Sequence, residues 1–414
     1  MDPTPEIDTT HSDHATDRKI LPSAVTDTAD VVIVGARCAG AARALLLARA
    51  GHDVLVVDRA AFPSDTLSTH AIARGGVVQL HRWGLLDSVL ASGAPPIRRI
   101  EFHTGGDPDV RTVKDRYGVD HLVAPRRHVL DPLLQGAAEA AGARVRPGTT
   151  VTEVLRDASG RVVGVAGRDE RGPIELRARF VVGADGLKSR VARSVGARLL
   201  DRRSSSSATH YAYFAGDWTA MEYHLGDGSF AGVFPTHSGE ACVWVCAPDD
   251  WALRHRRRHS SIDEAFRAMV EATSPTLAAR LLDTARTSTA RGMMSIPNQI
   301  VQPVGDGWAL VGDAGYHRDA ITGHGISDAF RDAELLAVAL DRALMSPAEE
   351  HDALCTYQHE RDRMLREIFE LTCELSEVPP RPRFVELQKQ LATAIDRHAG
   401  ELAERPLFAA APAA

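Results

Sequence analysis

A glycine turn followed by an acidic residue marks a candidate nucleotide site near the start of the chain. Gly35 and Gly40 bound this turn, which stands between an apolar run and a helical pattern, so backbone N–H groups can face a pyrophosphate. Asp58 follows the next apolar run, about 20 positions on, where an acidic side chain accepts ribose hydroxyls. Arg37 replaces the middle glycine of the usual pattern, so its side chain must turn away from the phosphates or clasp them. The segment predicts a site for an adenine dinucleotide.

Two segments far downstream place further aspartates where a strand gives way to a helix. The apolar runs 180–183 and 308–311 each lead into such a turn, and the turns hold Asp185, Gly186, Gly312 and Asp313. Ligands of an α/β sheet bind outside the carboxyl ends of its strands, so we expect the three segments to meet around one nucleotide. Helix capping is the alternative role of these aspartates, because Asp favours helix starts.

These turns require a parallel sheet with helices between its strands. Strands are expected at 31–34 and 54–57, with a helix over 41–50 between them. Between residues 210 and 247, β-rich runs alternate with turn residues, which predicts a second, mostly antiparallel sheet. The expected fold class is α/β, in which a Rossmann-like domain is interwoven with an antiparallel β-sheet substrate domain and followed by C-terminal helices.

Aromatic side chains gather in that second sheet. They could wall a pocket for a flat or apolar substrate, or they could fill the core between sheet and helices. The candidates for substrate contacts are Tyr211, Tyr213, Phe230 and Phe234.

Composition excludes several classes of protein. The net charge of -7 arises from interspersed signs, which disfavours a nucleic-acid partner. Five cysteines without CxxC spacing indicate neither a disulfide framework nor a zinc site, and they fit a reducing, cytoplasmic location. The N-terminal stretch lacks the features of a secretory signal, and no apolar run reaches the roughly 18 residues of a membrane span. The oligomeric state stays open.

The three segments, in this order, resemble the flavoprotein monooxygenase superfamily that shares the para-hydroxybenzoate hydroxylase fold. This superfamily includes geranylgeranyl-reductase-like and halogenase-like branches, and the resemblance covers residues 29–345. A faint Phe-Pro pattern at 230–235 is similar to the reductase-like branch. The halogenase-like branch is disfavoured, because no lysine lies between Ile20 and Val113, where its catalytic lysine is expected.

The resemblance implies FAD as the cofactor and NAD(P)H as a reductant that docks transiently. Asp58, with Arg59 beside it, would hold the adenosine ribose, and Asp313 would bond the ribityl chain. A helix start at 323–326 would place N–H groups against the flavin and stabilise the negative charge of the reduced ring. The implied cofactor residues are Gly35, Arg37, Gly40, Asp58, Arg59, Arg127, Asp185, Gly186, Gly312, Asp313, Gly323, Gly325 and Ile326.

Two histidines stand where the resemblance places the isoalloxazine ring. His70 ends a loop beside the ring, and His324 occupies a position where glutamine is common. Both are candidates for catalysis, and a structural or positioning role is the alternative for each. Ala320 stands in place of a usual proline, so substrate geometry beside the flavin is expected to differ from the family pattern.

The implied activity is that of an FAD-dependent, NAD(P)H-consuming monooxygenase. It would hydroxylate or epoxidise a small organic, aromatic or polyketide-like metabolite of secondary metabolism with dioxygen, through a flavin C4a-hydroperoxide. Two alternatives stay open: a geranylgeranyl-reductase-like enzyme that saturates an alkene, and a non-catalytic flavin-binding protein.

We expect a discontinuous FAD-binding domain and a smaller substrate domain. The FAD-binding domain combines 29–95, 121–199 and 290–345, and the substrate domain combines 96–120 and 200–289. A C-terminal helical segment covers 346–400, a disordered tail is expected at 1–28, and a loose tail at 401–414.

Overall fold

A parallel sheet forms the centre of the computed structural model, which describes residues 25–409. Its strands are β1 (Val25–Val34), β2 (Val54–Val57), β5 (Arg144–Arg146), β8 (Gly172–Gly183) and β17 (Trp308–Leu310). They run parallel in the order β5-β2-β1-β8-β17. Three further strands extend this sheet antiparallel to their neighbours, namely β6 (Thr150–Arg156), β7 (Val162–Asp169) and β16 (Val304–Gly305).

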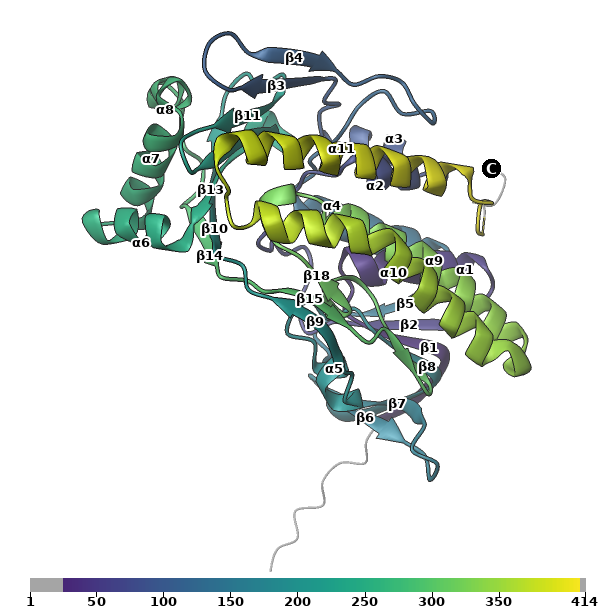
Figure 1. Ribbon diagram of the computed structural model, residues 1–414. Helices are drawn as coiled ribbons and strands as arrows, with labels where there is room; N and C mark the ends of the chain where they lie inside the picture. The colour runs from purple at the N-terminus through teal and green to yellow at the C-terminus, as the bar shows by residue number, and fades with distance from the viewer. Residues whose placement is uncertain (1–24, 410–414) are drawn as a thin grey trace, which may run out of the picture.

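The central strands are apolar along their buried length because both faces of the sheet are covered. On one face, Val31 and Ile33 pack against α1 (Cys38–Arg49), α4 (Arg127–Ala140) and α9 (Gly325–Met345). On the other face, Val32 and Val34 pack against residues of β6, β7 and α5 (Arg190–Val195). The long helix α10 (Glu350–Leu375) packs against α9 and completes this half of the molecule (Figure 1).

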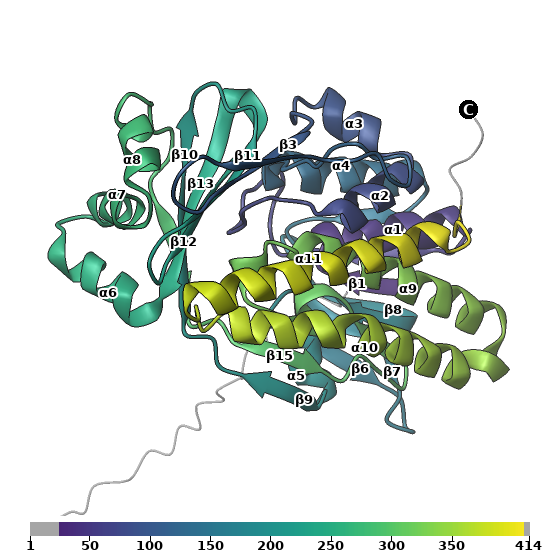
Figure 2. The same ribbon diagram turned by 45° about the horizontal axis from the view of Figure 1, so that its top comes forward.

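A second, mostly antiparallel sheet stands beside the first. Its strands, in spatial order, are β14 (Arg291–Met294), β10 (Ser207–Ala215), β13 (Glu240–Pro248), β12 (Phe230–Pro235), β11 (Met221–Leu225), β3 (Arg99–His103) and β4 (Asp109–Thr112). One face packs on the helices α6 (Asp249–Arg258), α7 (Ile262–Thr273) and α8 (Pro275–Leu282). The other face meets α11 (Arg381–Glu404), which crosses the molecule from this sheet toward α2 (Arg74–Arg82) (Figure 2).

Smaller elements join the two sheets. A third sheet has the order β18-β15-β9, formed by Tyr316–His317, Asn298–Val301 and Leu199–Arg203 respectively. The helix α3 (Leu86–Ala91) follows α2, and short 3-10 turns occupy His237–Gly239, Gly312–Ala314, Ala320–Thr322 and Pro347–Glu349. None of the helices within residues 25–409 combines the length and apolar character that a membrane crossing needs.

The fold class predicted from the sequence is confirmed, and two predicted boundaries are wrong. Strand β14 belongs to the second sheet, where it pairs with β10, although residue 290 was expected to open the last FAD-binding segment. Helix α11 continues to Glu404, past the predicted end of the helical segment at 400, because Leu402 is buried in the hydrophobic core between the central sheet and its helices. The division into two domains stays a proposal.

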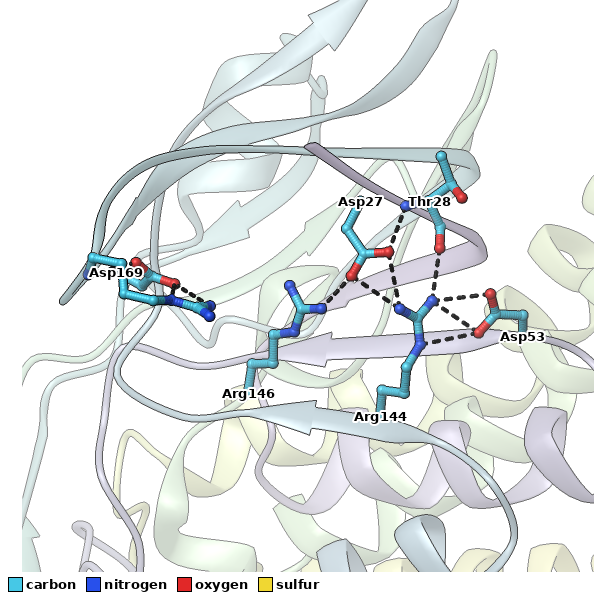
Figure 3. A network of polar contacts seen from close by, with 7 residues as sticks. Asp27, Thr28, Asp53, Arg144, Arg146 and Asp169 are labelled. Atoms are coloured by element: carbon cyan, nitrogen blue, oxygen red, sulfur yellow. Dashed lines mark hydrogen bonds and ion pairs between the residues drawn. The ribbon is translucent and has the colours of Figure 1, made fainter. Parts of the chain in front are cut away.

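The predicted N-terminal tail is also too long, because β1 begins at Val25 and pairs with β8 from its first residue. Charged side chains bind the N-terminal end of β1 to β5 and to the residue before β2 (Figure 3). Arg144 on β5 donates to Asp27 and to Asp53 at 2.9 Å, and Arg146 also pairs with Asp27. Residues 1–24 lie outside the described part of the chain.

Candidate functional site

The three predicted nucleotide-binding turns meet at one edge of the central sheet. The N–H of Gly35 donates to the carbonyl of Val57 at 2.7 Å, which joins the ends of β1 and β2. The N–H of Ala184 donates to Val34 at 2.8 Å, and that of Val311 donates to Gly183 at 2.9 Å. The carboxyl ends of β2, β1, β8 and β17 therefore lie side by side, as a nucleotide site of this fold requires.

Glycine is required in the first turn by its conformation and by close packing. Gly35 has a φ of 109°, and a Cβ atom there would lie 2.3 Å from the carbonyl oxygen of Ala184. A Cβ atom on Gly40 would lie 1.8 Å from the carbonyl oxygen of Gly35. Both distances are far too short for a Cβ atom. Only glycine at positions 35 and 40 therefore lets the turn pack against Ala184 and the start of α1 pack against the turn.

A cavity of about 760 Å³ opens at this edge of the sheet. Its size lies in the range of about 300–1,000 Å³ that small-molecule and cofactor sites occupy. Gly40 lies in the turn but does not line the cavity. Most of the other residues predicted to bind cofactor or substrate form the cavity wall. These residues are Gly35, Arg37, Asp58, Arg59, His70, Arg127, Asp185, Gly186, Tyr211, Gly312, Asp313, Gly323, His324, Gly325 and Ile326.

The cavity wall has the space and the acceptor that FAD requires. A Cβ atom at Gly186, Gly323 or Gly325 would meet nothing within 4 Å, so these positions open directly into the cavity. Asp313 is exposed, and its carboxylate accepts no hydrogen bond from residues 25–409, which leaves it to bind hydroxyl groups of a ligand. The residues present fit the cofactor.

The two other predicted aspartates are already engaged by the backbone. Asp58 accepts from the N–H groups of Ala36 and Ala60, each at 2.8 Å, and the remaining lone pairs of its carboxylate are available to a ribose. Asp185 accepts from the N–H groups of Arg190 at 2.6 Å and Val191 at 3.2 Å, and so supports the start of α5 together with the N-cap residue Ser189. Asp185 therefore has the helix-start role that the sequence analysis gave as an alternative, and it also lines the cavity.

A buried carboxylate that the sequence analysis missed organises the cationic wall of the cavity. Asp131 has a side chain 0% exposed and accepts from Arg37 at 2.7 Å and from Arg127 at 3.0 Å. The second guanidinium nitrogen of Arg37 donates to the Ser64 hydroxyl at 3.0 Å, so this side chain is clasped to the loop. Arg127 and Asp131 stand four residues apart on α4, and that spacing was the available signal.

His324 stands at the start of α9, between this cavity and a second one. Its Nδ1 donates to the carbonyl of Thr322, because a carbonyl can only accept, and its Nε2 is therefore an acceptor. Burial, together with nearby Arg318, lowers the pKa of His324 to about 4. His324 is thus a neutral imidazole at pH 7. Below it, Arg318 donates to Asp328 at 2.7 Å and fixes the loop to α9.

His70 lies at the junction of the two sheets in a conformation that few side chains adopt. It is 1% exposed, and its φ of 68° falls in the left-handed region. Its Nε2 bonds the hydroxyl of Tyr213, whose ring carries the guanidinium of Arg126 at 3.6 Å from its centroid. Its Nδ1 is buried and makes no hydrogen bond within the described chain. Burial first, and then Arg126, hold the pKa of His70 well below its usual value.

A second cavity of about 880 Å³ lies next to the first along the second sheet, and we call it the apolar groove. Ala71, Gly323 and His324 line both cavities, so the two spaces adjoin at these residues. The groove runs between the second sheet and α11, and its apolar wall includes Ile100, Phe102, Met221, Tyr223, Phe230, Phe234, Phe384 and Leu391. Of the predicted substrate contacts, Phe230 and Phe234 lie here, Tyr211 lies in the first cavity, and Tyr213 lines neither.

Comparisons with known proteins agree with this geometry. Menaquinone reductase of Mycobacterium tuberculosis is 29% identical over 332 residues, which cover 77% of this chain and 78% of that protein. Digeranylgeranylglycerophospholipid reductase 1 of Methanopyrus kandleri is 28% identical over 364 residues, covering 85% and 90%. The solved structure of PqsL, described as a probable FAD-dependent monooxygenase from Pseudomonas aeruginosa, superposes with a TM-score of 0.74 at 25% identity, covering 89% of this chain and all of that one.

The resemblance stated from the three sequence segments is confirmed by these relatives. A family described as an FAD binding domain matches residues 28–372, which include the whole of the first cavity wall. The chain therefore belongs to the FAD binding domain family and is an FAD-dependent oxidoreductase.

Proposed function

We propose that this FAD-dependent oxidoreductase is a monooxygenase of a flat or elongated apolar molecule, with NAD(P)H and dioxygen as co-substrates. The observation that carries the proposal is that the FAD cavity and the apolar groove adjoin at Ala71, Gly323 and His324, which line both. A substrate in the groove would therefore meet the cofactor at the start of α9.

The chemistry that FAD supplies when bound is acceptance of hydride from NAD(P)H and activation of dioxygen. The N–H groups of Gly325 and Ile326, at the first turn of α9, have no partner within the helix, and both residues line the cavity. They stabilise negative charge on a ring placed against them, since the helix dipole adds to their own polarity.

The aromatic walls beside this point would disfavour water near the reacting atoms. Tyr211, in the wall of the FAD cavity, is 2% exposed, and Phe230 and Phe234, in the wall of the apolar groove, are 6% and 2% exposed, so aromatic side chains of the sheet pack closely around both spaces. Exclusion of water prevents the loss of reactive oxygen species to solvent and strengthens the local field. The aromatic lining supports a substrate that is itself flat or apolar.

His70 is the residue best placed to exchange a proton with a bound molecule. Its Nε2 is held by Tyr213, so the tautomer of the ring follows from the state of that hydroxyl. Its buried Nδ1 has no partner in the described residues, and His70 belongs to the wall of the cavity. A hydrogen bond from a ligand to Nδ1 would satisfy this atom, which otherwise carries a desolvation cost of about 1–3 kcal/mol.

A reductase that saturates an alkene is the second candidate. It is favoured by the names of the two relatives above, both of which are reductases that align over most of this chain. The length of the apolar groove suits an extended chain as well as a flat ring. The same FAD cavity would serve either reaction, so the fate of dioxygen separates them.

The test combines flavin reduction with isotope labelling. FAD-loaded protein is mixed with NADH or NADPH and a panel of flat phenols and prenylated quinones, under labelled dioxygen and under strict anaerobiosis. Label in the product supports the monooxygenase, full turnover without oxygen supports the reductase, and flavin that neither nucleotide reduces indicates a non-catalytic binding protein. Phe230→Ala should raise KM for the active compound several-fold, whereas Leu282→Ala, at an exposed position on α8, should leave it unchanged.

A further inference from the structure

A cluster of histidines and glutamates lies on the second sheet, on the face turned away from the apolar groove. Strands β3 and β11 pair in parallel, with Glu101 opposite Glu222 and His103 opposite His224. Side chains alternate along a strand, so these four residues share one face. The alternate positions face the groove, namely Ile100, Phe102, Met221, Tyr223 and Leu225.

The two imidazoles and one carboxylate of this cluster are close enough to share a single ion. The rings of His103 and His224 stack with centroids 4.1 Å apart and an interplanar angle of 5°. Nε2 of His224 lies 3.2 Å from Oε2 of Glu222, and Nε2 of His103 lies 4.0 Å from the same oxygen. One ligand atom from each residue lies within 4.8 Å of the others. Tetrahedral zinc bonds of about 2.1 Å separate ligand atoms by about 3.4 Å. Because an imidazole binds a metal in its ring plane, His103, whose side chain is 24% exposed, must rotate out of the stack for both rings to reach one ion.

The surrounding hydrogen bonds orient the ligand atoms toward one another. The Ser274 hydroxyl bonds Nδ1 of His224 at 3.0 Å, which leaves Nε2 facing Glu222. Arg280 donates to Oε1 of Glu222 at 2.7 Å and leaves Oε2 facing the imidazoles. Partners of this kind, which bind the far atom of a ligand side chain, are typical of metal sites.

His103 supplies an independent sign that a ligand is missing from the cluster. Its Nε2 is buried and forms no hydrogen bond within residues 25–409, although Oε2 of Glu101 lies 3.4 Å away. Oε1 of Glu101 is held by Arg99 at 2.7 Å, so the second oxygen of this carboxylate also faces the cluster. A buried imidazole nitrogen without a partner is costly, and a cation would satisfy it.

We propose that His103, Glu222 and His224 bind a divalent transition-metal ion, and that the carboxylate of Glu101, beside His103, turns toward them to supply the fourth ligand. Two imidazoles and two carboxylates suit Zn²⁺ in a closed, tetrahedral, structural site. The ion would clamp β3 to β11. Because Phe102 and Tyr223 lie on the opposite face of the same strands, the clamp would also fix the wall of the apolar groove. This site is distinct from the FAD cavity.

Zinc titration of the tag-free, FAD-loaded protein tests the proposal. After treatment with a chelator, ZnCl₂ is added and binding is followed by calorimetry and by metal analysis, in wild type, His103→Asn and His224→Asn. The matched control is His121→Asn, because His121 also bonds a carboxylate, Asp120, at 2.6 Å but stacks on no second histidine. FAD content and circular dichroism report whether each variant is folded.

We expect one Zn²⁺ per chain in wild type and in the control, with at least a tenfold loss of affinity in each site variant. Zinc should also slow proteolysis at Gly105-Gly106, between β3 and β4, in wild type and in the control but not in the site variants. If His103→Asn or His224→Asn does not fold, Ser274→Ala keeps every ligand and should still weaken binding by about 10–100-fold. Absence of zinc binding in wild type, or equal affinity in wild type and the site variants, would overturn the proposal.

Discussion

The substitution Asp131→Asn tests the cationic wall of the FAD cavity most directly. It preserves the shape of the side chain and removes its charge at a position that is 0% exposed. Arg37 and Arg127 would then share one neutral acceptor in place of a carboxylate that now bonds them at 2.7 and 3.0 Å.

The expected loss of stability follows from the burial of the two arginines. Removal of one partner from a buried ion pair costs about 3–5 kcal/mol, because the other charge is left uncompensated. The side chain of Arg127 is 11% exposed and bears most of this cost. Arg37 is 26% exposed and recovers part of its solvation from water. We therefore expect a loss near the lower limit, about 3 kcal/mol, which is roughly a hundredfold in the folding equilibrium.

Urea unfolding of the FAD-loaded protein measures this loss, and FAD titration measures its effect on the site. The control is Asp109→Asn, because Asp109 pairs with Arg111 on the surface, with side chains 56% and 58% exposed, and such pairs contribute less than about 1 kcal/mol. FAD affinity should fall in Asp131→Asn alone, since both of its arginines line the cavity. Equal stability of Asp131→Asn and wild type, within about 0.5 kcal/mol, would refute the reasoning.

Three further predictions concern the same cavity. Asp58→Ala should weaken FAD binding about tenfold, as expected for lost ribose hydrogen bonds of about 1–1.5 kcal/mol, and an unchanged titration would place the ribose elsewhere. Gly325→Val should slow flavin reduction by NAD(P)H, because its side chain would enter space that is open in the structure, and a normal stopped-flow rate would remove this segment from the site. The pKa of His324 falls from 6.5 in the unfolded chain to about 4 in the folded protein, so the unfolded state binds the extra proton. Stability is therefore lost as the pH drops from 6.5 to 4, by up to about 1.4 kcal/mol per pH unit, and urea unfolding of His324→Asn should show a shallower loss than wild type.

The sequence predicted the elements that carry the nucleotide turns, because their signals are local. The strands at 31–34 and 54–57 and the helix over 41–50 are apolar runs broken by glycine, and they appear as β1, β2 and α1. The β-rich runs between 210 and 247 appear as β10 to β13. Since strands of a parallel sheet end at one edge, the convergence of Asp58, Asp185 and Asp313 also followed from the sequence.

The partners of these residues could not be predicted, because they come from distant parts of the chain. Tyr213 was interpreted as a substrate contact, whereas its hydroxyl bonds His70, which lies 143 positions earlier. The apolar groove was foreseen only on its sheet side, through Phe230 and Phe234. Its other wall is formed by α11. The spacing of apolar residues in the sequence shows that a helix has an apolar face, but it does not show which surface that face packs against.

The sequence by itself determined which segments form strands, where glycine admits a close approach, and which family the chain resembles. Only the tertiary structure decided that Asp131 holds Arg37 and Arg127, that His70 bonds Tyr213, and that the FAD cavity adjoins the apolar groove. The physical reason is that turns and strands are specified by neighbours within a few residues, whereas burial and hydrogen bonding depend on which surfaces pack together. Those contacts exist only once the two sheets and α11 have closed on each other.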